Sequence, residues 1–151
     1  MTRKCIFRLG LALPLCWVAT AATIASAADD GRLLAPLPAA AQAVLQAEMR
    51  DSLRALNGVL ELLAADKVKE AGALAEKELG VSTMGRHRDK PFDARPGPHM
   101  PPAMHRIGIA GHEAASAFAN AAASGDRGKA LAALPAVTGT CVSCHSAFRI
   151  R

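Results

Sequence analysis

The sequence predicts an all-α protein folded as an antiparallel four-helix bundle, with a long loop between its second and third helices. Alanine and leucine, the two best helix formers, make up most of its apolar residues, and tyrosine is absent. No stretch alternates β-branched or aromatic residues with polar ones over the length of a strand. Four segments instead show the spacing or the end signals of amphipathic helices. The 151 residues suffice for one domain with a single hydrophobic core.

Residues 1–27 are typical of a cleaved signal peptide. The segment opens with three basic residues, Arg3, Lys4 and Arg8. A short apolar run over residues 9–24 follows, and Ala25-Ser26-Ala27 gives the small-x-small pattern that signal peptidase recognises. A transmembrane anchor is the weaker interpretation, because the run is short for a bilayer crossing. Cys16 is not preceded by the small residue that a lipoprotein site needs. We therefore expect export to a periplasm and a mature domain over residues 28–151.

Cleavage after Ala27 changes both the charge and the cysteine content. The whole chain has a formal net charge of +5, but three of its 18 basic residues lie in the signal peptide. The mature part therefore has 15 basic and 13 acidic residues. Without a run of basic residues, this balance argues against nucleic acid as a partner. We expect no membrane association after cleavage. Cys141 and Cys144 are the cysteines left in the mature chain.

Two helices are expected in the first half of the mature chain, after a flexible lead-in over residues 29–37. The first runs from Pro38 to about Ala65, and a tight link joins it to the second, Lys67 to Leu79. We expect Asp66 to be the N-cap of the second helix and Gly80 to end it. The predicted buried stripe of the first helix is Leu45, Met49, Leu53, Leu56, Leu60 and Leu63.

A long loop and two further helices complete the predicted domain. Residues 81–101 lack periodicity and contain four prolines, so we expect a loop. Pro101-Pro102 begins the third helix, since proline is tolerated in a first turn, and Ser124-Gly125 ends it. Its predicted buried stripe is Met104, Ile107, Gly111, Ala114, Phe118 and Ala121. Asp126 caps the fourth helix, which we expect to reach Arg151 with a kink or a break at Pro135.

The last predicted helix contains Cys141-Val142-Ser143-Cys144-His145, which is the C-x-x-C-H signature of c-type haem attachment. Positions i, i+3 and i+4 of a helix share one face, so both thiols and the imidazole point the same way. The thiols can form thioethers with the two haem vinyl groups while His145 binds the iron. We therefore predict one covalent haem c.

Other roles for this pair of cysteines fit less well. A structural zinc site needs a second pair of ligands at similar spacing. A thioredoxin-like redox pair follows a strand in a βαβ unit, which this sequence does not offer. A disulfide is expected of exported proteins but leaves His145 unexplained.

The run from Cys141 to Arg149, at the C-terminal end of four predicted helices, resembles the class II c-type cytochromes, the cytochrome c′ family. The resemblance implies a periplasmic four-helix bundle with haem packed near one end and His145 as its proximal ligand. It places Arg149 one turn after that histidine, beside the proximal face of the haem. It also suggests a homodimer through the first two helices. Phe148 is more simply a core residue.

In that family, a residue of the first helix faces the far side of the iron and decides the function. If Met49 is that residue, the iron is six-coordinate and suited to electron transfer with redox partner proteins, because Met/His ligation raises the reduction potential of the haem. Met49 as core filler would instead place Leu45 over the iron and open the site to NO or CO. We favour electron transfer. We expect no enzymatic turnover, because the sequence shows no paired carboxylates and no nucleophile with a neighbouring base beside the haem motif.

The loop and the third helix also contain several soft metal ligands: His87, His99, His105, His112, Met84, Met100 and Met104. Thioether and imidazole groups at this density are a copper-binding pattern. We favour an ordinary polar loop. His105 and His112 share one helix face, from which a distal haem ligand is a further alternative.

Overall fold

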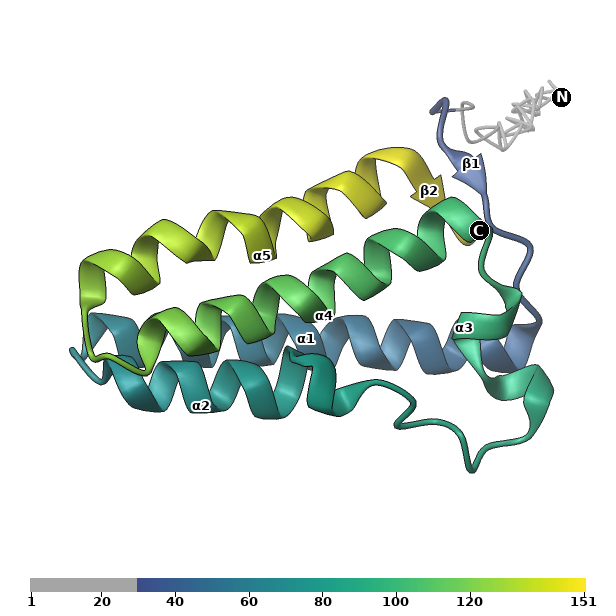
Figure 1. Ribbon diagram of the computed structural model, residues 1–151. Helices are drawn as coiled ribbons and strands as arrows, with labels where there is room; N and C mark the ends of the chain where they lie inside the picture. The colour runs from purple at the N-terminus through teal and green to yellow at the C-terminus, as the bar shows by residue number, and fades with distance from the viewer. Residues whose placement is uncertain (1–29) are drawn as a thin grey trace, which may run out of the picture.

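Four main helices packed together make up most of the protein, described here from a computed structural model over residues 30–151. They are α1 (Ala39–Ala64), α2 (Val68–Leu79), α4 (Pro102–Ala122) and α5 (Arg127–Ala147). The mostly helical fold expected from the sequence is confirmed. α2 packs on α1 and α4, α4 packs on α5, and each main helix runs opposite to the one before it (Figure 1). The expected signal peptide, residues 1–27, lies outside the described residues.

The turn between α1 and α2 is built around Asp66, which is not the N-cap of α2. Asp66 has a φ of 60°, and Lys67 occupies the N-cap position without a side-chain cap. The Asp66 N–H donates to Leu63 O at 3.2 Å and the Lys67 N–H donates to Leu62 O at 2.8 Å. This pair of bonds is the Schellman motif, which satisfies carbonyls at the end of a helix. Our prediction was wrong because Asp66 ends α1 instead of beginning α2.

The buried face of α1 is shifted from the stripe that the spacing predicted. The structure buries Ala41, Leu45, Ala55, Val59 and Leu63. Leu45 and Leu63 are therefore confirmed as buried, but Met49, Leu53 and Leu60 are exposed. The small residue Ala55 and the β-branched Val59 form the packed face, so the larger leucines lie on a neighbouring face. The apolar surface of α1 is therefore wider than the face that the neighbouring elements cover.

The segment between α2 and α4 is mostly loop, as predicted, but contains three short helical turns. These are η1 (Val81–Thr83), η2 (Phe92–Ala94) and α3 (Pro96–His99). η2 and α3 pack against α1. α4 then begins at Pro102 with Pro101 as its N-cap, as the two prolines predicted. Of its predicted stripe, Met104 and Phe118 are buried and the others are partly buried.

α5 begins as predicted and ends earlier than predicted. The Asp126 side chain accepts a hydrogen bond from the Lys129 N–H at 3.0 Å, which confirms the cap. Pro135 lies inside α5 without splitting it. The helix stops at Ala147, and Phe148–Arg149 form the short strand β2. The prediction of a helix to Arg151 was wrong because these residues pair with the beginning of the described chain.

The expected flexible lead-in is in fact an ordered segment, which we call the N-terminal strap (residues 30–37). It contains β1 (Leu33–Leu34), which pairs in parallel with β2 so that Leu33 lies opposite Phe148 (Figure 1). The Ala35 N–H donates to Arg149 O at 2.8 Å. Ala35 and Leu37 are buried. These two apolar side chains and the backbone pairing hold the strap against the C-terminal end of the chain.

Two apolar clusters fill the interior. The first lies along the main helices and consists of Val59, Leu63, Val68, Ala71, Ala75, Ala115, Phe118, Ala122, Ala130 and Val137. The second consists of Ala35, Leu37, Ala41, Leu45, Met104 and Phe148, with Cys144 among the partly buried residues packed on it. The second cluster therefore joins the strap and the beginnings of α1 and α4 to the end of α5.

α5 is apolar for a helix with so little of its surface buried. Ala130 and Val137 are the residues of α5 that the structure buries. By length and composition alone, α5 is the one helix in residues 30–151 that would be able to cross a membrane. It nevertheless packs against α4, which gives one side of it a protein partner.

Candidate cofactor site at the end of α5

The three residues of the C-x-x-C-H motif lie on the last turns of α5. Cys141 and His145 are exposed, and Cys144 is partly buried. Both cysteines are free thiols. Because the motif is helical throughout, the i, i+3 and i+4 positions present two thiols and an imidazole from one side of the helix. Unpaired, accessible thiols of this spacing fit covalent attachment of haem.

The two thiols have different surroundings. The Cys141 thiol contacts Val137 O at 3.7 Å. Cys144 packs on the second apolar cluster. Burial raises the pKa of the Cys144 thiol, and the neighbouring Cys141 raises it further. Partial burial in apolar surroundings thus favours the protonated form of the Cys144 thiol.

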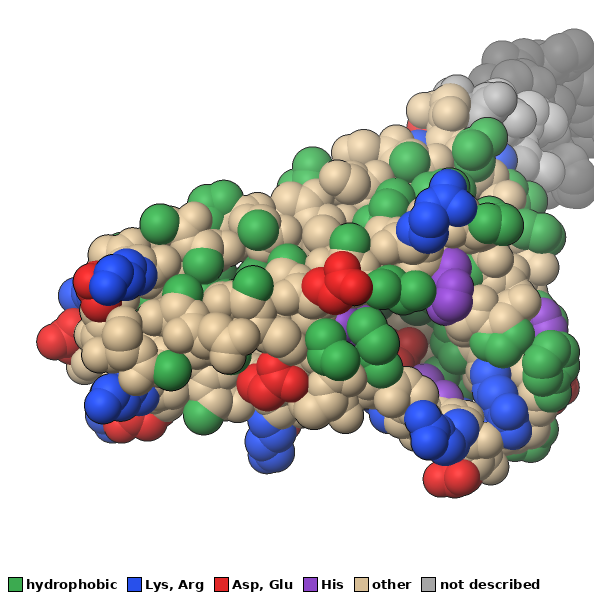
Figure 2. Space-filling model, viewed as in Figure 1, with side chains coloured by type: hydrophobic (Ala, Val, Ile, Leu, Met, Phe, Trp, Pro, Cys, Tyr) green, Lys and Arg blue, Asp and Glu red, His purple; other side chains and the backbone are tan. Residues whose placement is uncertain are grey.

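Apolar side chains surround the motif on the helices and on the surface. Leu45, Met104 and Phe148 form the wall of the second cluster beside Cys144. Val142, inside the motif, is 64% exposed. Hydrophobic side chains lie along the exposed surface of α5 in Figure 2. A large apolar group bonded here would find the apolar side chains of the second cluster beside Cys144.

The two candidates for the residue opposite His145 differ in burial. Leu45 is 5% exposed and lies in the same cluster as Cys144, whereas Met49, one turn further along α1, is 42% exposed. Leu45 is thus already packed against protein atoms. The Met49 thioether lies on the uncovered face of α1, where it is accessible to a ligand.

Phe148 and Arg149 lie beyond the helix. Phe148 is buried in the second cluster, which confirms it as a core residue. Arg149 is not on a further helical turn after His145. It belongs to β2, and its carbonyl oxygen accepts the hydrogen bond from Ala35. The backbone pairing with the strap has replaced the turn on which the resemblance placed this side chain.

Several of the other histidines have contacts within the protein. His112 Nδ1 lies 2.7 Å from Leu79 O and 3.2 Å from Thr83 Oγ1. His87 Nε2 lies 2.7 Å from Glu48 Oε1. His99 Nε2 lies 3.1 Å from Phe92 O. The His87 contact joins the loop to α1, and the contact of His112 with Thr83 joins the loop to α4.

Metal-binding side chains do not form a cluster in the part of the chain that the structure describes. Over residues 30–151, no group of three or more His, Cys, Asp or Glu side chains is arranged to hold a metal ion. Two shallow surface depressions lie between α2 and α4, beside Gly72, and between α1 and α2, beside Ala55. Neither is lined by a residue of the C-x-x-C-H motif.

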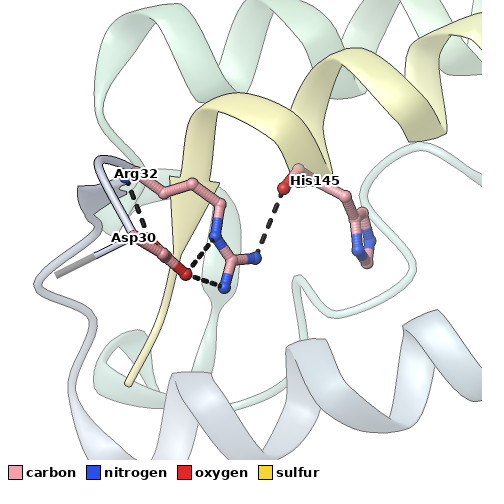
Figure 3. Close-up of polar contacts among 3 residues, drawn as sticks. All are labelled: Asp30, Arg32 and His145. Carbon is pink, nitrogen blue, oxygen red and sulfur yellow. Dashed lines mark hydrogen bonds and ion pairs between the residues drawn. The ribbon is translucent and has the colours of Figure 1, made fainter. Parts of the chain in front are cut away.

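No sequence pattern indicates that Arg32 belongs to this region. Its Nη1 donates to the backbone oxygen of His145 at 3.3 Å, across 113 positions of the chain (Figure 3). The Arg32 side chain is held by Asp30, to which Nε donates at 2.8 Å. The two residues are ordinary surface charges in the sequence, so local patterns carry no signal of the contact.

Comparisons with known proteins give no match: no family model, no curated protein and no solved structure matches this chain.

Proposed function

We propose that this protein is a periplasmic monohaem c-type cytochrome that transfers electrons between redox partner proteins. The observation that carries the proposal is the C-x-x-C-H motif itself, placed on one helix with two free thiols and an accessible imidazole. The four packed helices are, in this proposal, the antiparallel four-helix bundle of a class II c-type cytochrome. Residues 28–151 form the mature domain after export.

The attachment chemistry needs only the groups of the motif and the two vinyl groups of haem. Each thiol would add across one vinyl C=C bond, with the sulfur bonding to one carbon and the thiol hydrogen going to the other. No oxidant or reductant is consumed. Cys141 and Cys144 would thereby hold the group at two points, and His145 would bind its iron. When bound, the iron would cycle between Fe(III) and Fe(II), which is one-electron chemistry without a substrate turned over.

The uncovered apolar surface of the protein supports this proposal. α5 is apolar yet mostly unburied, and α1 exposes Met49, Leu53 and Leu60. Burial of apolar area stabilises by roughly 25 cal/mol per Å². A porphyrin fixed at Cys141 and Cys144 would gain that stabilisation by covering apolar surface of α5 and of the second cluster beside Cys144. The remaining exposed leucines are available to the homodimer that the resemblance suggests.

Electron transfer is the favoured function if Met49 is the sixth ligand of the iron. An exposed thioether one turn beyond Leu45 is free to reorient, since methionine has three rotatable bonds. Met/His ligation raises the reduction potential and leaves no open position for a gas.

Binding of NO or CO is the second candidate. It is favoured by the burial of Leu45 in the same cluster as Cys144. If Leu45 instead faces the iron, the apolar side chain leaves the sixth position open. The protein would then capture or buffer a small gas.

Haem attachment is tested by expressing the full chain together with a c-type maturation system and extracting the product with acid acetone. The haem should stay on the polypeptide, and the Cys141→Ala/Cys144→Ala double variant should lose it. Ser143→Ala, a matched change at an exposed position between the cysteines, should keep it. Haem that the solvent removes from the unchanged protein would refute covalent attachment. The reduced spectrum with and without CO then separates the carrier from the gas binder.

A further inference from the structure

The N-terminal strap is bonded to the segment that directly follows the proposed iron ligand. β1 pairs with β2, whose first residue is three positions after His145. Ala35 and Leu37 anchor the strap in the second apolar cluster, next to Phe148. The strap therefore has a fixed position relative to the end of α5.

Arg32 uses that fixed position to contact the last turn of α5. Its Nε and Nη2 donate to Asp30 Oδ2 at 2.8 and 2.5 Å, and its backbone N–H donates to Asp30 Oδ1 at 3.0 Å. These bonds orient the guanidinium so that Nη1 donates to His145 O at 3.3 Å (Figure 3). The imidazole of His145 points away from the guanidinium in the same view.

The carbonyl that Arg32 contacts is one that the helix itself leaves unsatisfied. The last four C=O groups of an α-helix have no intrahelical partner, and His145 lies within the last four residues of α5. A cation near a helix C-terminus also interacts favourably with the helix dipole. Arg32 thus acts as a side-chain cap supplied from the other end of the described chain.

We infer that Arg32, oriented by Asp30, is a positioning residue for His145. By bonding the carbonyl of the ligand residue itself, it restrains the last turn of α5 and so the direction of the imidazole. This inference rests on the proposed function, since positioning matters only if His145 binds iron. The pair is exposed, and an exposed ion pair contributes little to global stability, so the effect is local.

Hydrogen exchange measures the restraint without using the haem. The Phe148 N–H, which donates to Cys144 O, reports on the last turn of α5. In Arg32→Ala, exchange of this amide should accelerate about two- to fivefold, the range that an exposed charged contact supports. Asp30→Asn should act in the same direction, because it removes the charge that orients the guanidinium. Arg127→Ala, at the opposite end of the same helix, is the matched control and should leave this amide unchanged.

The EPR spectrum of the ferric holoprotein measures the positioning of the imidazole. Arg32→Ala should shift the g-values, which depend on the orientation of the axial imidazole, and Arg127→Ala should not. If haem is attached but Arg32→Ala has the same exchange rate and the same EPR spectrum as the unchanged protein, the role of Arg32 is refuted while the proposed function stands. If the chain carries no covalent haem, the proposed function fails, and the exchange experiment still decides whether Arg32 restrains α5.

Discussion

The Ser116 hydroxyl donates a hydrogen bond to the Glu76 carboxylate at 2.5 Å and so ties α4 to the last turn of α2. The backbone N–H of Ser82 donates to the other carboxylate oxygen at 3.1 Å, and the Val81 N–H donates to Ser116 Oγ at 2.9 Å. Glu76 therefore joins α2, α4 and the beginning of the long loop. The loop carries its own hydrogen-bonded attachment to the helices at this point.

This arrangement predicts a loss of stability in acid. The hydrogen bond from the Ser116 hydroxyl is the largest cause of a lowered pKa of Glu76, and the hydrogen bond from the Ser82 backbone N–H is the next largest. A lowered folded-state pKa contributes stability that is present above the unfolded pKa and is lost as the pH falls through the folded one. Glu76→Gln should lower the free energy of unfolding at neutral pH by about 1 to 2 kcal/mol, which is the lower part of the range for hydrogen bonds to a charged group because Glu76 is only partly buried.

Urea unfolding measured between about pH 7 and pH 3, which spans the ordinary range for a glutamate, checks this prediction. Stability of the unchanged protein should fall more steeply in acid than that of Glu76→Gln. Glu113→Gln, an exposed carboxylate on α4, is the control. Identical acid profiles for the unchanged protein and Glu76→Gln would contradict this role.

Gly72 permits the close approach of α2 and α4. A Cβ at this position would lie 2.8 Å from Ala122 Cβ and 3.0 Å from Ala119 O. Gly72→Ala should therefore destabilise the protein by about 1 to 3 kcal/mol, the usual cost of overpacking. Gly108→Ala on α4 is the matched control, because a Cβ there would have no atom within 4 Å. The control should be neutral or stabilising by roughly 0.5 to 1 kcal/mol. Equal effects of the two changes in thermal unfolding would exclude close packing as the cause.

Asp66 holds a left-handed backbone conformation that glycine adopts more readily. Its φ of 60° is at the position after the end of α1 where glycine is usual. Replacement by glycine should stabilise the protein by up to about 1 kcal/mol, since a non-glycine residue there costs roughly 1 to 2 kcal/mol and glycine returns part of that as chain entropy. Lys67→Gly, with an ordinary φ of −89°, should destabilise. A lower denaturation midpoint for Asp66→Gly than for the unchanged protein would rule out this account of the turn.

Met49 is the residue whose replacement separates the two proposed functions. If it is the sixth ligand, Met49→Ala should convert a low-spin spectrum into a high-spin spectrum that responds to CO. Leu53→Ala, one turn further along the same exposed face, should leave the spectrum low-spin. A high-spin spectrum already present in the unchanged protein would favour gas binding, with Leu45 facing the iron.

Local signals predicted the elements that depend on local interactions. The capping residue Asp126 predicted the beginning of α5, and the two prolines predicted the beginning of α4, because both act within one helical turn. The C-x-x-C-H motif could likewise be identified from the sequence, since its spacing is local and the helix that contains it is predicted by neighbouring residues. Asp66 shows the limit even here: the same residue type can begin one helix or end another.

The sequence by itself determined the mostly helical class, the positions of the main helices and the motif that carries the proposed chemistry. Tertiary structure decided which face of α1 is buried, because Val59 and Leu53 are both apolar and only packing against neighbouring helices distinguishes them. It also decided where α5 ends, since β2 exists only by pairing with a strap from the other end of the described chain. The contact of Arg32 with His145 has the same origin. Hydrogen bonds between residues 113 positions apart leave no periodicity in the sequence, so only the folded chain brings them together.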